Sequence, residues 1–378
     1  MKIFVIGING IPARHGGFET CVDNTSVRLA ASGHELTVYC RRRNIKLKEK
    51  FYKRVRLIKL PSIGTKHFET ISHSFLSIIN ILFKKCDVIH IYGVGSSIFT
   101  PFLKMLGKKI VVSVDALDWE RKKWGKLASW YLRNSAMFAV KYADEIIVDS
   151  KVVQRFYKEK LKRDTVYIPY GAIAGRKCDE KVIEKFTLKK DNYLLFVGRL
   201  IPEKGVHYLI NAYKGLDTEL ELVIIGGDWF SNSYTDSLKD MAIGSKVKFL
   251  GFVYGEDYNN ICSGAYLYIQ PSEVDGTSPA LVAAMGFGNC IIANGIPENL
   301  ETIGEAGFSY RKNDVEDLRE KLKYLIANPE EVNEYRKKAE NRVRNYYDWD
   351  RVSKAIEEVY EGVIKGKKAI PDLYEFIK

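Results

Sequence analysis

Several features that mark common protein classes are missing from this 378-residue sequence. The N-terminus carries no signal-peptide pattern, because Met1-Lys2 leads directly into the apolar run IFVIG. The longest apolar-leaning run, residues 75–83, is far shorter than the roughly 20 residues that a membrane-spanning helix needs. The six cysteines are scattered, with no CxxC pair and no metal-ligand spacing. We therefore expect reduced thiols, no metal site and a cytoplasmic location.

Two further absences narrow the choice of enzyme class. The loop after the first apolar run, GINGIPARHGGFET, lacks the GxGxxG spacing of a dinucleotide site, which counts against a dehydrogenase. No DxD-type metal motif, internal repeat or recognised nucleic-acid module is evident. The hydrophobic content of 46% and the charged content of 28% are typical of a globular protein with a substantial core.

The charge is distributed unevenly along the chain. Residues 1–170 hold 31 Lys and Arg against 14 Asp and Glu, a net of +17, and the remaining residues carry a net of −5. Within residues 41–60, ten residues are basic and one is acidic. A basic first half of the chain attracts an anionic surface, either lipid headgroups or nucleic acid. The alternative interpretation is a solvated basic surface that binds no partner.

Short apolar runs alternate with helical patterns in two series. This alternation predicts an α/β protein with two parallel, doubly wound sheets. We expect domains at residues 1–170 and 171–348, facing each other across a cleft, and a helical tail at 349–378 that crosses back to the first domain. The expected strands are residues 2–7, 35–40, 87–92, 109–114, 145–150, 193–198, 221–226, 246–251, 265–270 and 289–294.

In such sheets ligands bind at the carboxyl ends of the strands. Arg199 and Lys204 flank the turn after one expected strand, in FVGRLIPEKG, and the helix is expected to begin near Pro202. Two cations beside the free amides of a helix start suit a diphosphate. The alternatives are a salt bridge with Glu203 or a solvated pair of cations.

The segment DGTSPALVAAMG follows the strand expected at 265–270. Pro279 suits the first turn of a helix, and Ser278 or Thr277 suits its N-cap. The free amides there form an anion site. Asp275 can accept hydrogen bonds from sugar hydroxyls, or it can be an ordinary turn residue before Gly276.

Two loops of the first domain are also candidates. Gly16-Gly17, before a helical pattern, would let backbone amides approach a phosphate, although turn glycines look the same. In VDALDWERKKWGK, carboxylates stand beside aromatic rings, as in carbohydrate sites, or they begin a surface helix. The side chains of this second candidate are Asp115, Asp118, Trp119, Glu120, Arg121, Lys123 and Trp124.

These segments together resemble a known family. IPYGA, FVGRLIPEKG, GGDW, VKFLGFV, PSEVDGTSPALVAAMG and PENLETIGEAG occur in the order seen in retaining glycosyltransferases of family 4. The first half resembles the rhamnosyltransferase-like branch, through GIPARHGGFET, CRRRN, KHFETISHSF and DALDWERKKW. The resemblance covers nearly the whole chain and implies the GT-B fold, two Rossmann-like domains of which the second holds most of the donor.

The resemblance also implies residue roles. Arg199 and Lys204 would neutralise the diphosphate leaving group of a nucleotide sugar, which is a substrate, so no cofactor is expected. Gly17, next to Gly16, would lend its amide to a donor phosphate, and Asp115 would position the sugar or the acceptor.

Other roles fall on the second half of the chain. The backbone of Val253 would meet the nucleobase, Asp275 would touch the donor sugar, and the amides of Gly276, Thr277 and Ser278 would approach the sugar and the phosphate. The family usually has a ribose-binding Glu eight residues after the first acid, where this chain has Ala283. A missing charged hydrogen bond of roughly 1.5–3 kcal/mol would weaken donor binding. Three alternatives follow: another group binds the ribose, the donor carries a deoxyribose, or the protein is impaired.

We therefore expect a metal-independent, retaining hexosyltransferase that acts in the synthesis of a cell-surface polysaccharide or glycoconjugate, with a rhamnosyl donor suggested by the branch. The basic first domain would bind a glycan or lipid-pyrophosphate acceptor peripherally at the inner membrane face. A weakened homologue that binds a sugar nucleotide or lipid is the alternative. We expect no nucleic-acid partner. The basic residues within 41–60 leave a nucleic-acid-binding function as a further alternative.

Overall fold

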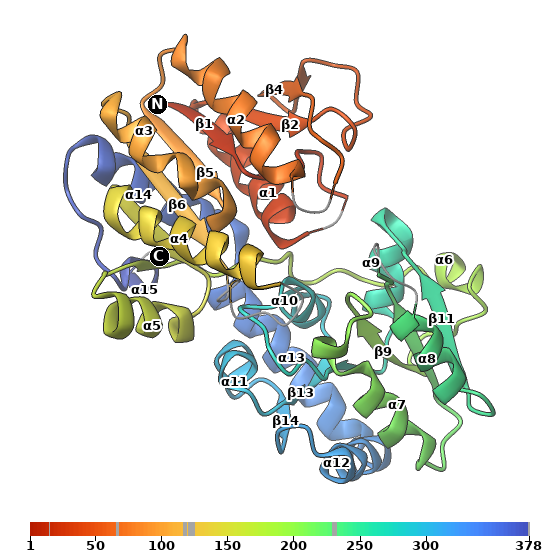
Figure 1. Ribbon diagram of the computed structural model, residues 1–378. Coiled ribbons are helices and arrows are strands. Elements are labelled where there is room, and N and C mark those ends of the chain that lie inside the picture. The colour runs from red at the N-terminus through yellow and green to blue at the C-terminus, as the bar shows by residue number, and fades with distance from the viewer. Residues whose placement is uncertain (15, 66–67, 116–118, 120–124, 229–232, 377–378) are drawn as a thin grey trace. The chain divides into compact units, whose positions relative to one another are not determined.

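The computed structural model describes residues 1–378 except 15, 66–67, 116–118, 120–124, 229–232 and 377–378 (Figure 1). Its contacts divide the chain into two compact units. The first unit comprises Met1–Tyr170 with Trp349–Lys378, and the second comprises Gly171–Asp348. No helix of the described residues is long and apolar enough to cross a membrane.

The first unit is built on an eight-stranded sheet with the order β3-β4-β2-β1-β5-β6-β7-β8. All neighbouring strands are parallel except β3 and β4, which form an antiparallel edge pair. The strands are β1 (Lys2–Ile6), β2 (Glu35–Arg41), β3 (Phe51–Tyr52), β4 (Val55–Leu60), β5 (Val88–Tyr92), β6 (Ile110–Val114), β7 (Glu145–Val148) and β8 (Val166–Tyr167).

Helices cover both faces of this sheet, and its central strands are buried on both sides. The core on one face includes Leu29 of α1 and Ile356 of α14, and the core on the other includes Ile78 of α2 and Ala139 of α4. The helices are α1 (Gly17–Ala31), α2 (Glu69–Leu82), the 3-10 helix η1 (Val94–Phe99), α3 (Thr100–Met105), α4 (Lys126–Tyr142), α5 (Lys151–Leu161), α14 (Trp349–Ile364) and α15 (Leu373–Phe376).

Helix α14 packs against α1, and a buried histidine fixes it to the sheet. His90 of β5 lies with Nδ1 2.6 Å from the Tyr360 hydroxyl and Nε2 2.7 Å from Ser113 Oγ. Burial lowers the pKa of His90 from 6.5 to about 3, so this ring is neutral in the folded chain. The last residues of the sequence thereby complete the core of the first unit.

The second unit is built on a six-stranded parallel sheet with the order β11-β10-β9-β12-β13-β14. Two apolar clusters, one on each face, hold its helices. Its strands are β9 (Tyr193–Val197), β10 (Glu221–Ile225), β11 (Val247–Gly251), β12 (Leu267–Gln270), β13 (Cys290–Asn294) and β14 (Phe308–Tyr310). Its helices are α6 (Glu180–Glu184), the 3-10 helix η3 (Pro202–Lys204), α7 (Val206–Lys214), α8 (Ser233–Met241), α9 (Gly255–Ser263), α10 (Pro279–Gly286), α11 (Pro297–Ile303), α12 (Val315–Ala327) and α13 (Pro329–Tyr346).

The ten strands predicted from the sequence are confirmed, each within two residues at either end. Four strands were not predicted, namely β3, β4, β8 and β14. The helix expected near Pro202 begins there only as the short 3-10 helix η3, and α7 starts at Val206.

Candidate functional site in the second unit and its counterpart in the first

Both sheets contain a point at which the strand order reverses. In the second unit, β9 lies between β10 and β12, so the chain leaves β9 in one direction and later returns on its other side. Ligands of doubly wound sheets bind beyond the carboxyl ends of the strands at such a point. Arg199 follows β9 and Asp275 follows β12, so both lie in the loops that flank this reversal.

The turn after β9 is pressed against the segment after β12. Gly205, between η3 and α7, has φ +66, and a Cβ there would lie 2.1 Å from the carbonyl oxygen of Pro271. Only glycine permits both the left-handed backbone and this close approach. Lys204, the residue before Gly205, is therefore held directly beside the loop that carries Asp275.

Lys204 and Asp275 form an ion pair. Lys204 Nζ lies 2.6 Å from Asp275 Oδ2, and the side chains are only 16% and 13% exposed. The alternative pairing of Lys204 with Glu203 is not what the structure shows. The cation and the carboxylate predicted as site residues are thus in direct contact, which fixes the position of both.

Gln270 orients this carboxylate from the end of β12. Its side chain is buried, and Nε2 donates to Asp275 Oδ2 at 3.1 Å and lies 3.2 Å from Ser278 Oγ. Tyr268 in turn donates its hydroxyl hydrogen to Gln270 Oε1 at 2.9 Å. A continuous chain of hydrogen bonds therefore runs from the sheet interior to the start of α10.

The start of α10 is Ser278 at the N-cap and Pro279 in the first turn, as predicted. The Ser278 hydroxyl makes no capping bond to this helix and instead receives a bond from Gln270. The first amides of a helix lack partners within it. Thr277 and Ser278 are buried, so the segment from Gly276 onward presents backbone groups and not long side chains.

Arg199 is the second cation of this site. Its side chain is exposed, and it makes no hydrogen bond or ion pair with any residue in the described part of the chain. Arg199 and the paired Lys204 both stand in the loop between β9 and α7. An exposed guanidinium is available for a bidentate contact with a phosphate.

Glu298, in the first turn of α11, is an acid that was not predicted from the sequence as a site residue. Burial raises the pKa of the Glu298 carboxyl above its ordinary value, and the neighbouring carboxylate of Asp275 raises it further. A carboxyl group near a second carboxylate holds its proton more readily and can donate a hydrogen bond. Its only signal in the sequence was its place in PENLETIGEAG, after β13.

Val253 lies between β11 and α9, flanked by two aromatic rings. Phe252 and Tyr254 are partly exposed, with parallel rings whose centroids are 6.2 Å apart. Phe252 also lies against Gly227, where a Cβ would approach its ring to 2.9 Å. These flat surfaces beside Val253 were not predicted, and they are the kind of surface on which a nucleobase stacks.

In the first unit, the corresponding reversal lies between β1 and β5. Gly16, with φ +97, precedes Gly17, the first residue of α1. A Cβ at Gly16 would lie 2.0 Å from Glu19 Oε2. The backbone at this helix start is thus held close to a buried carboxylate.

That carboxylate belongs to a buried polar network. Glu19 Oε1 accepts from the side chain of Asn9 at 2.8 Å, and Asn9 Oδ1 accepts from Arg41 at 2.8 Å. Arg41 also lies 3.2 Å from Glu69 and donates to Thr70 at 2.9 Å. Asn9 and Glu19 near the first loop, Arg41 at the end of the second strand, and Glu69 and Thr70 at the start of α2 therefore converge in one cluster. Arg41 is buried here, so residues 41–60 are not a uniformly exposed basic stretch.

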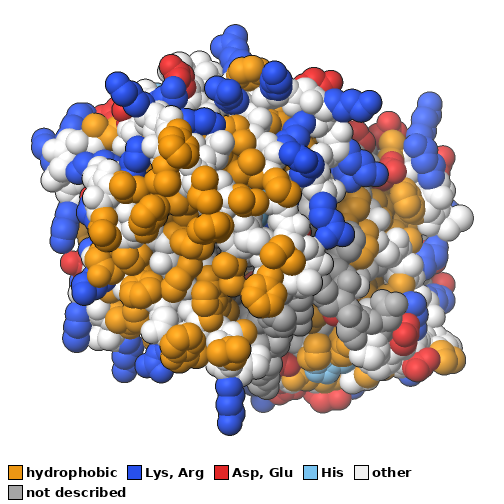
Figure 2. Space-filling view, turned by 45° about the horizontal axis from the view of Figure 1, so that its top comes forward, with side chains coloured by type: hydrophobic (Ala, Val, Ile, Leu, Met, Phe, Trp, Pro, Cys, Tyr) orange, Lys and Arg blue, Asp and Glu red, His pale blue; other side chains and the backbone are white. Residues whose placement is uncertain are grey.

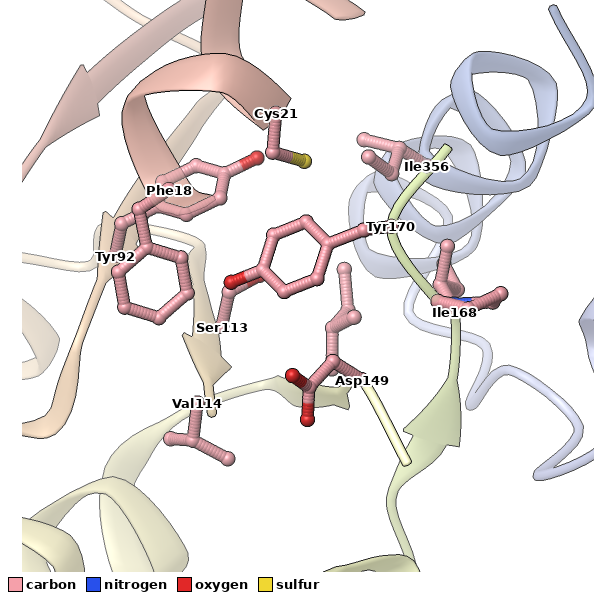
Figure 3. Close-up of a pocket in the computed structure, with 11 residues that line it drawn as sticks. Phe18, Cys21, Tyr92, Ser113, Val114, Asp149, Ile168, Tyr170 and Ile356 are labelled. Carbon is pink, nitrogen blue, oxygen red and sulfur yellow. The ribbon is translucent and has the colours of Figure 1, made fainter. Parts of the chain in front are cut away.

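Asp115 follows β6 and lies near the hydroxyl of Tyr170. Burial raises the pKa of Tyr170 well above its ordinary value, and the carboxylates of Asp115 and Asp149 add to this. Figure 3 shows Tyr170 surrounded by Cys21 of α1, Tyr92 at the end of β5 and Asp149. The cavity among them is about 20 Å³, enough for a single water, so the surroundings of Tyr170, the neighbour of Asp115, are tightly packed.

Trp119 is the one aromatic candidate near Asp115 that lies within the described residues. It lies 6.1 Å from Phe156, measured between ring centroids, and lines a hollow of about 480 Å³ with Arg133 and Lys160.

Within the described residues, no group of three or more His, Cys, Asp or Glu side chains could hold a metal ion. The other predicted residues, Asp118, Glu120, Arg121, Lys123 and Trp124, lie outside the described residues.

The predicted site residues thus fall into two sets. Lys204 and Asp275 are in contact, Gly276, Thr277 and Ser278 continue the segment of Asp275, and Arg199 and Val253 follow other strands of the same sheet. Gly16, Gly17 and Asp115 belong to the first unit. Ala283 lies on α10, half-buried, and carries no group that could bind a ribose.

Comparison with solved structures defines the fold as GT-B, which confirms the predicted fold class. Sucrose-phosphate synthase from Thermosynechococcus elongatus superposes with a TM-score of 0.83 at 18% identity, over 97% of this chain and 100% of that chain. HepE from Anabaena in complex with UDP-glucose gives a TM-score of 0.79 at 16% identity, over 96% and 100%.

The sequence comparisons match each half of the chain to a different family model. Residues 179–342 match the family described as glycosyl transferases group 1, and residues 1–173 match a domain of unknown function, DUF1972. An uncharacterized glycosyltransferase of Methanocaldococcus jannaschii is 28% identical over 63% of this chain and 64% of its own length.

Two further relatives carry more specific names. The lipopolysaccharide 1,2-N-acetylglucosaminetransferase of Salmonella typhimurium is 28% identical over 57% of this chain and 61% of its own. The capsular polysaccharide biosynthesis glycosyltransferase CapM of Staphylococcus aureus is 24% identical over 68% and 70%. The chain spans 64%, 62% and 61% of the first three curated relatives that it matches.

Proposed function

We propose that this protein is a glycosyltransferase of the group 1 type that moves a sugar from a nucleotide diphosphate sugar to a glycan or lipid-pyrophosphate-linked acceptor in polysaccharide synthesis. The observation that carries the proposal is the Lys204–Asp275 pair, which stands with Arg199 beside the start of α10. The complexes of the structural neighbour HepE with UDP-glucose support a nucleotide-sugar donor. The names of the Salmonella and Staphylococcus relatives support an acceptor in a surface polysaccharide.

The donor would be held by charge and by backbone groups. Arg199 and Lys204 bind the diphosphate, and the first amides of α10, after Gly276, Thr277 and Ser278, add hydrogen bonds to it. Asp275 accepts a hydrogen bond from a sugar hydroxyl, and its ion pair with Lys204 sets the spacing between sugar and diphosphate. In this proposal the backbone at Val253 meets the nucleobase.

The reaction would proceed with retention of the anomeric configuration. The bond from the anomeric carbon to the diphosphate oxygen breaks, and the acceptor oxygen bonds to that carbon on the same face. The acceptor hydroxyl proton passes to the departing phosphate oxygen. Arg199, Lys204 and the α10 amides stabilise the charge on the leaving group, which supplies the main catalytic effect without a metal. Asp115 positions the acceptor, and the amide of Gly17 donates a hydrogen bond to the donor phosphate.

Product analysis tests this assignment. The protein is incubated with UDP-, GDP- and dTDP-sugars, including dTDP-rhamnose, and a lipid-pyrophosphate-linked glycan, in the presence of EDTA. We expect one donor to be consumed, a product whose anomeric configuration by proton NMR equals that of the donor, and at least a hundredfold lower turnover in Arg199→Ala. An inverted product or a strict metal requirement would overturn the mechanism.

A second candidate function is favoured by Ala283. If no other group binds the ribose, the chain holds its donor weakly and serves as a sugar-nucleotide- or lipid-binding subunit with little turnover. Restoring the acid in Ala283→Glu would then tighten donor binding by roughly ten- to a hundredfold, the equivalent of one charged hydrogen bond. Unchanged affinity in this variant, with turnover in the unaltered chain, would exclude this second function.

A further inference from the structure

The first unit carries a broad exposed apolar face that the proposed donor chemistry does not use. Figure 2 shows hydrophobic side chains gathered across one side of the molecule, with Lys and Arg side chains around them. The most exposed members are Phe83 on the end of α2, Met105 on α3 and Leu127 on α4, which are 85%, 84% and 79% exposed. We call the exposed apolar side chains of α2, α3 and α4 the apolar face.

The face follows from the sequence of the three helices. On α2, Phe75 and Ile79 lie one turn apart, and Phe83 follows one turn further, so the three project from one side. On α4, Leu127 and Trp130 lie three residues apart at its start. These side chains are exposed although the opposite sides of α2 and α4 are buried in the core.

The three helices form one continuous surface. Both α2 and α4 pack on η1, and α3 packs on α4. The rings of Phe75 of α2 and Phe99 of η1 are 6.2 Å apart between centroids, which joins the helix to its neighbour. Exposed apolar side chains that adjoin one another across neighbouring helices are typical of an interaction site and not of the scattered exposure of an ordinary surface.

Positive charges predominate on α2, α3 and α4, which carry Lys104, Lys126, Arg133 and Lys141, although Asp144 after α4 pairs with Lys104 at 2.6 Å. The only acid on α2, α3 and α4 is Glu69, and it is paired with the buried Arg41 at 3.2 Å. Exposed cations at the edges include Lys85 after α2, Lys126 at the start of α4 and Lys141 at its end. The first unit as a whole carries 37 Lys and Arg against 20 Asp and Glu, and the second unit carries 22 against 27.

We infer that the apolar face docks on the surface of an anionic lipid bilayer. Phe, Trp, Leu and Met side chains would enter the boundary between headgroups and acyl chains, and the surrounding lysines would contact the anionic headgroups. A second copy of the chain is a poorer occupant, because pairing this face with itself brings like charges together. The inference deepens the lipid-linked acceptor of the proposed function, since it names the surface by which the chain meets the membrane.

Vesicle flotation without donor or acceptor tests the inference separately from the enzymatic proposal. The full chain is mixed with vesicles of phosphatidylcholine alone or with about one third phosphatidylglycerol. The apolar variant is Phe83→Ser/Met105→Ser/Leu127→Ser, and its matched control is Ile243→Ser/Tyr324→Ser, two exposed apolar residues of the second unit. The charge variant is Lys85→Glu/Lys126→Glu/Lys141→Glu, and its control is Lys185→Glu/Lys189→Glu/Lys190→Glu, with the same charge change.

We expect binding to anionic vesicles, at least tenfold weaker binding in both variants of the face, and unchanged binding in both controls. All substituted side chains are exposed, so circular dichroism should show unchanged unfolding in every variant. Equal binding of the apolar variant and the unaltered chain, or equal binding to neutral vesicles, would overturn the inference. A dimer in solution that the apolar variant converts to a monomer would also overturn it, because a second copy would then occupy the face.

Discussion

At the scale of single residues, the ion pair of Lys204 and Asp275 contributes to the stability of the second unit. They are only 16% and 13% exposed, so Lys204→Met leaves a largely buried carboxylate with Gln270 still donating to it. We expect the free energy of unfolding to fall by about 2 kcal/mol, less than for a fully buried pair. Urea unfolding measures this loss.

The control for this prediction is Lys239→Met on α8. Lys239 pairs with Asp236 at 3.5 Å, but the two side chains are 55% and 61% exposed. An exposed pair contributes little, so the change should stay below about 0.5 kcal/mol. Equal losses in the two variants would show that burial of the Lys204–Asp275 pair has no energetic consequence.

Arg41 and Arg42 are adjacent residues with opposite environments. Arg41 is buried and bonds to Asn9, Glu69 and Thr70, whereas Arg42 is exposed. Arg41→Ala leaves Glu69 and Asn9 without this partner, and we expect a loss on the order of 3 kcal/mol. Arg42→Ala should be nearly neutral in the same denaturation experiment. A neutral Arg41→Ala would contradict the structural role of the network.

At the scale of elements, the histidines buried in β5 and α2 make stability depend on pH. Burial holds the pKa of His90 at about 3 and that of His73 at about 4, both below the ordinary 6.5. The unfolded chain therefore binds these protons first. Stability is full above pH 6.5 and declines as the pH falls from 6.5 toward 4, by at most about 1.4 kcal/mol per pH unit for each histidine.

The variant His90→Gln isolates one of these contributions. We expect the slope of unfolding free energy against pH, between pH 6 and pH 5, to be shallower by about 1 kcal/mol per unit than in the unaltered chain. The slope is the readout, because the substitution can also lower stability at every pH. An unchanged slope would mean that His90 does not stay neutral in the folded chain.

The elements differ in how far the sequence could predict them. Ten strands could be predicted because their apolar runs are bounded by turn residues and alternate with helical periods. β4 was not predicted because Arg56 and Lys59 interrupt the apolar run in VRLIKL. β8 and β14 are only two and three residues long. Edge strands bury less surface, so their apolar signal is weak.

The site residues also differ in how far the sequence could predict them. Arg199, Lys204 and Asp275 could be placed because each follows a predicted strand. The bond from Gln270 to Asp275, the raised pKa of Glu298 and the convergence of Asn9 with Arg41 depend on contacts between distant segments. Such contacts leave no local pattern in the sequence.

At the scale of the whole molecule, the two units divide the proposed work. The second unit holds the cations and the carboxylate proposed to bind the donor, while the first carries the excess of positive charge and the apolar face. The donor site and the membrane surface are therefore separable. Changes at Phe83, Met105 and Leu127 should leave donor affinity unaltered, and Arg199→Ala should leave vesicle binding unaltered.

The central claim is that the second unit binds a nucleotide diphosphate sugar through Arg199 and Lys204. Calorimetric titration with UDP-, GDP- and dTDP-sugars in the absence of metal tests it most directly, with Arg155→Ala, an exposed arginine of the first unit, as the control for Arg199→Ala. We predict micromolar binding of one donor, at least tenfold weaker in Arg199→Ala and unchanged in Arg155→Ala. Absence of binding to every donor, or equal affinity in Arg199→Ala, would contradict the claim.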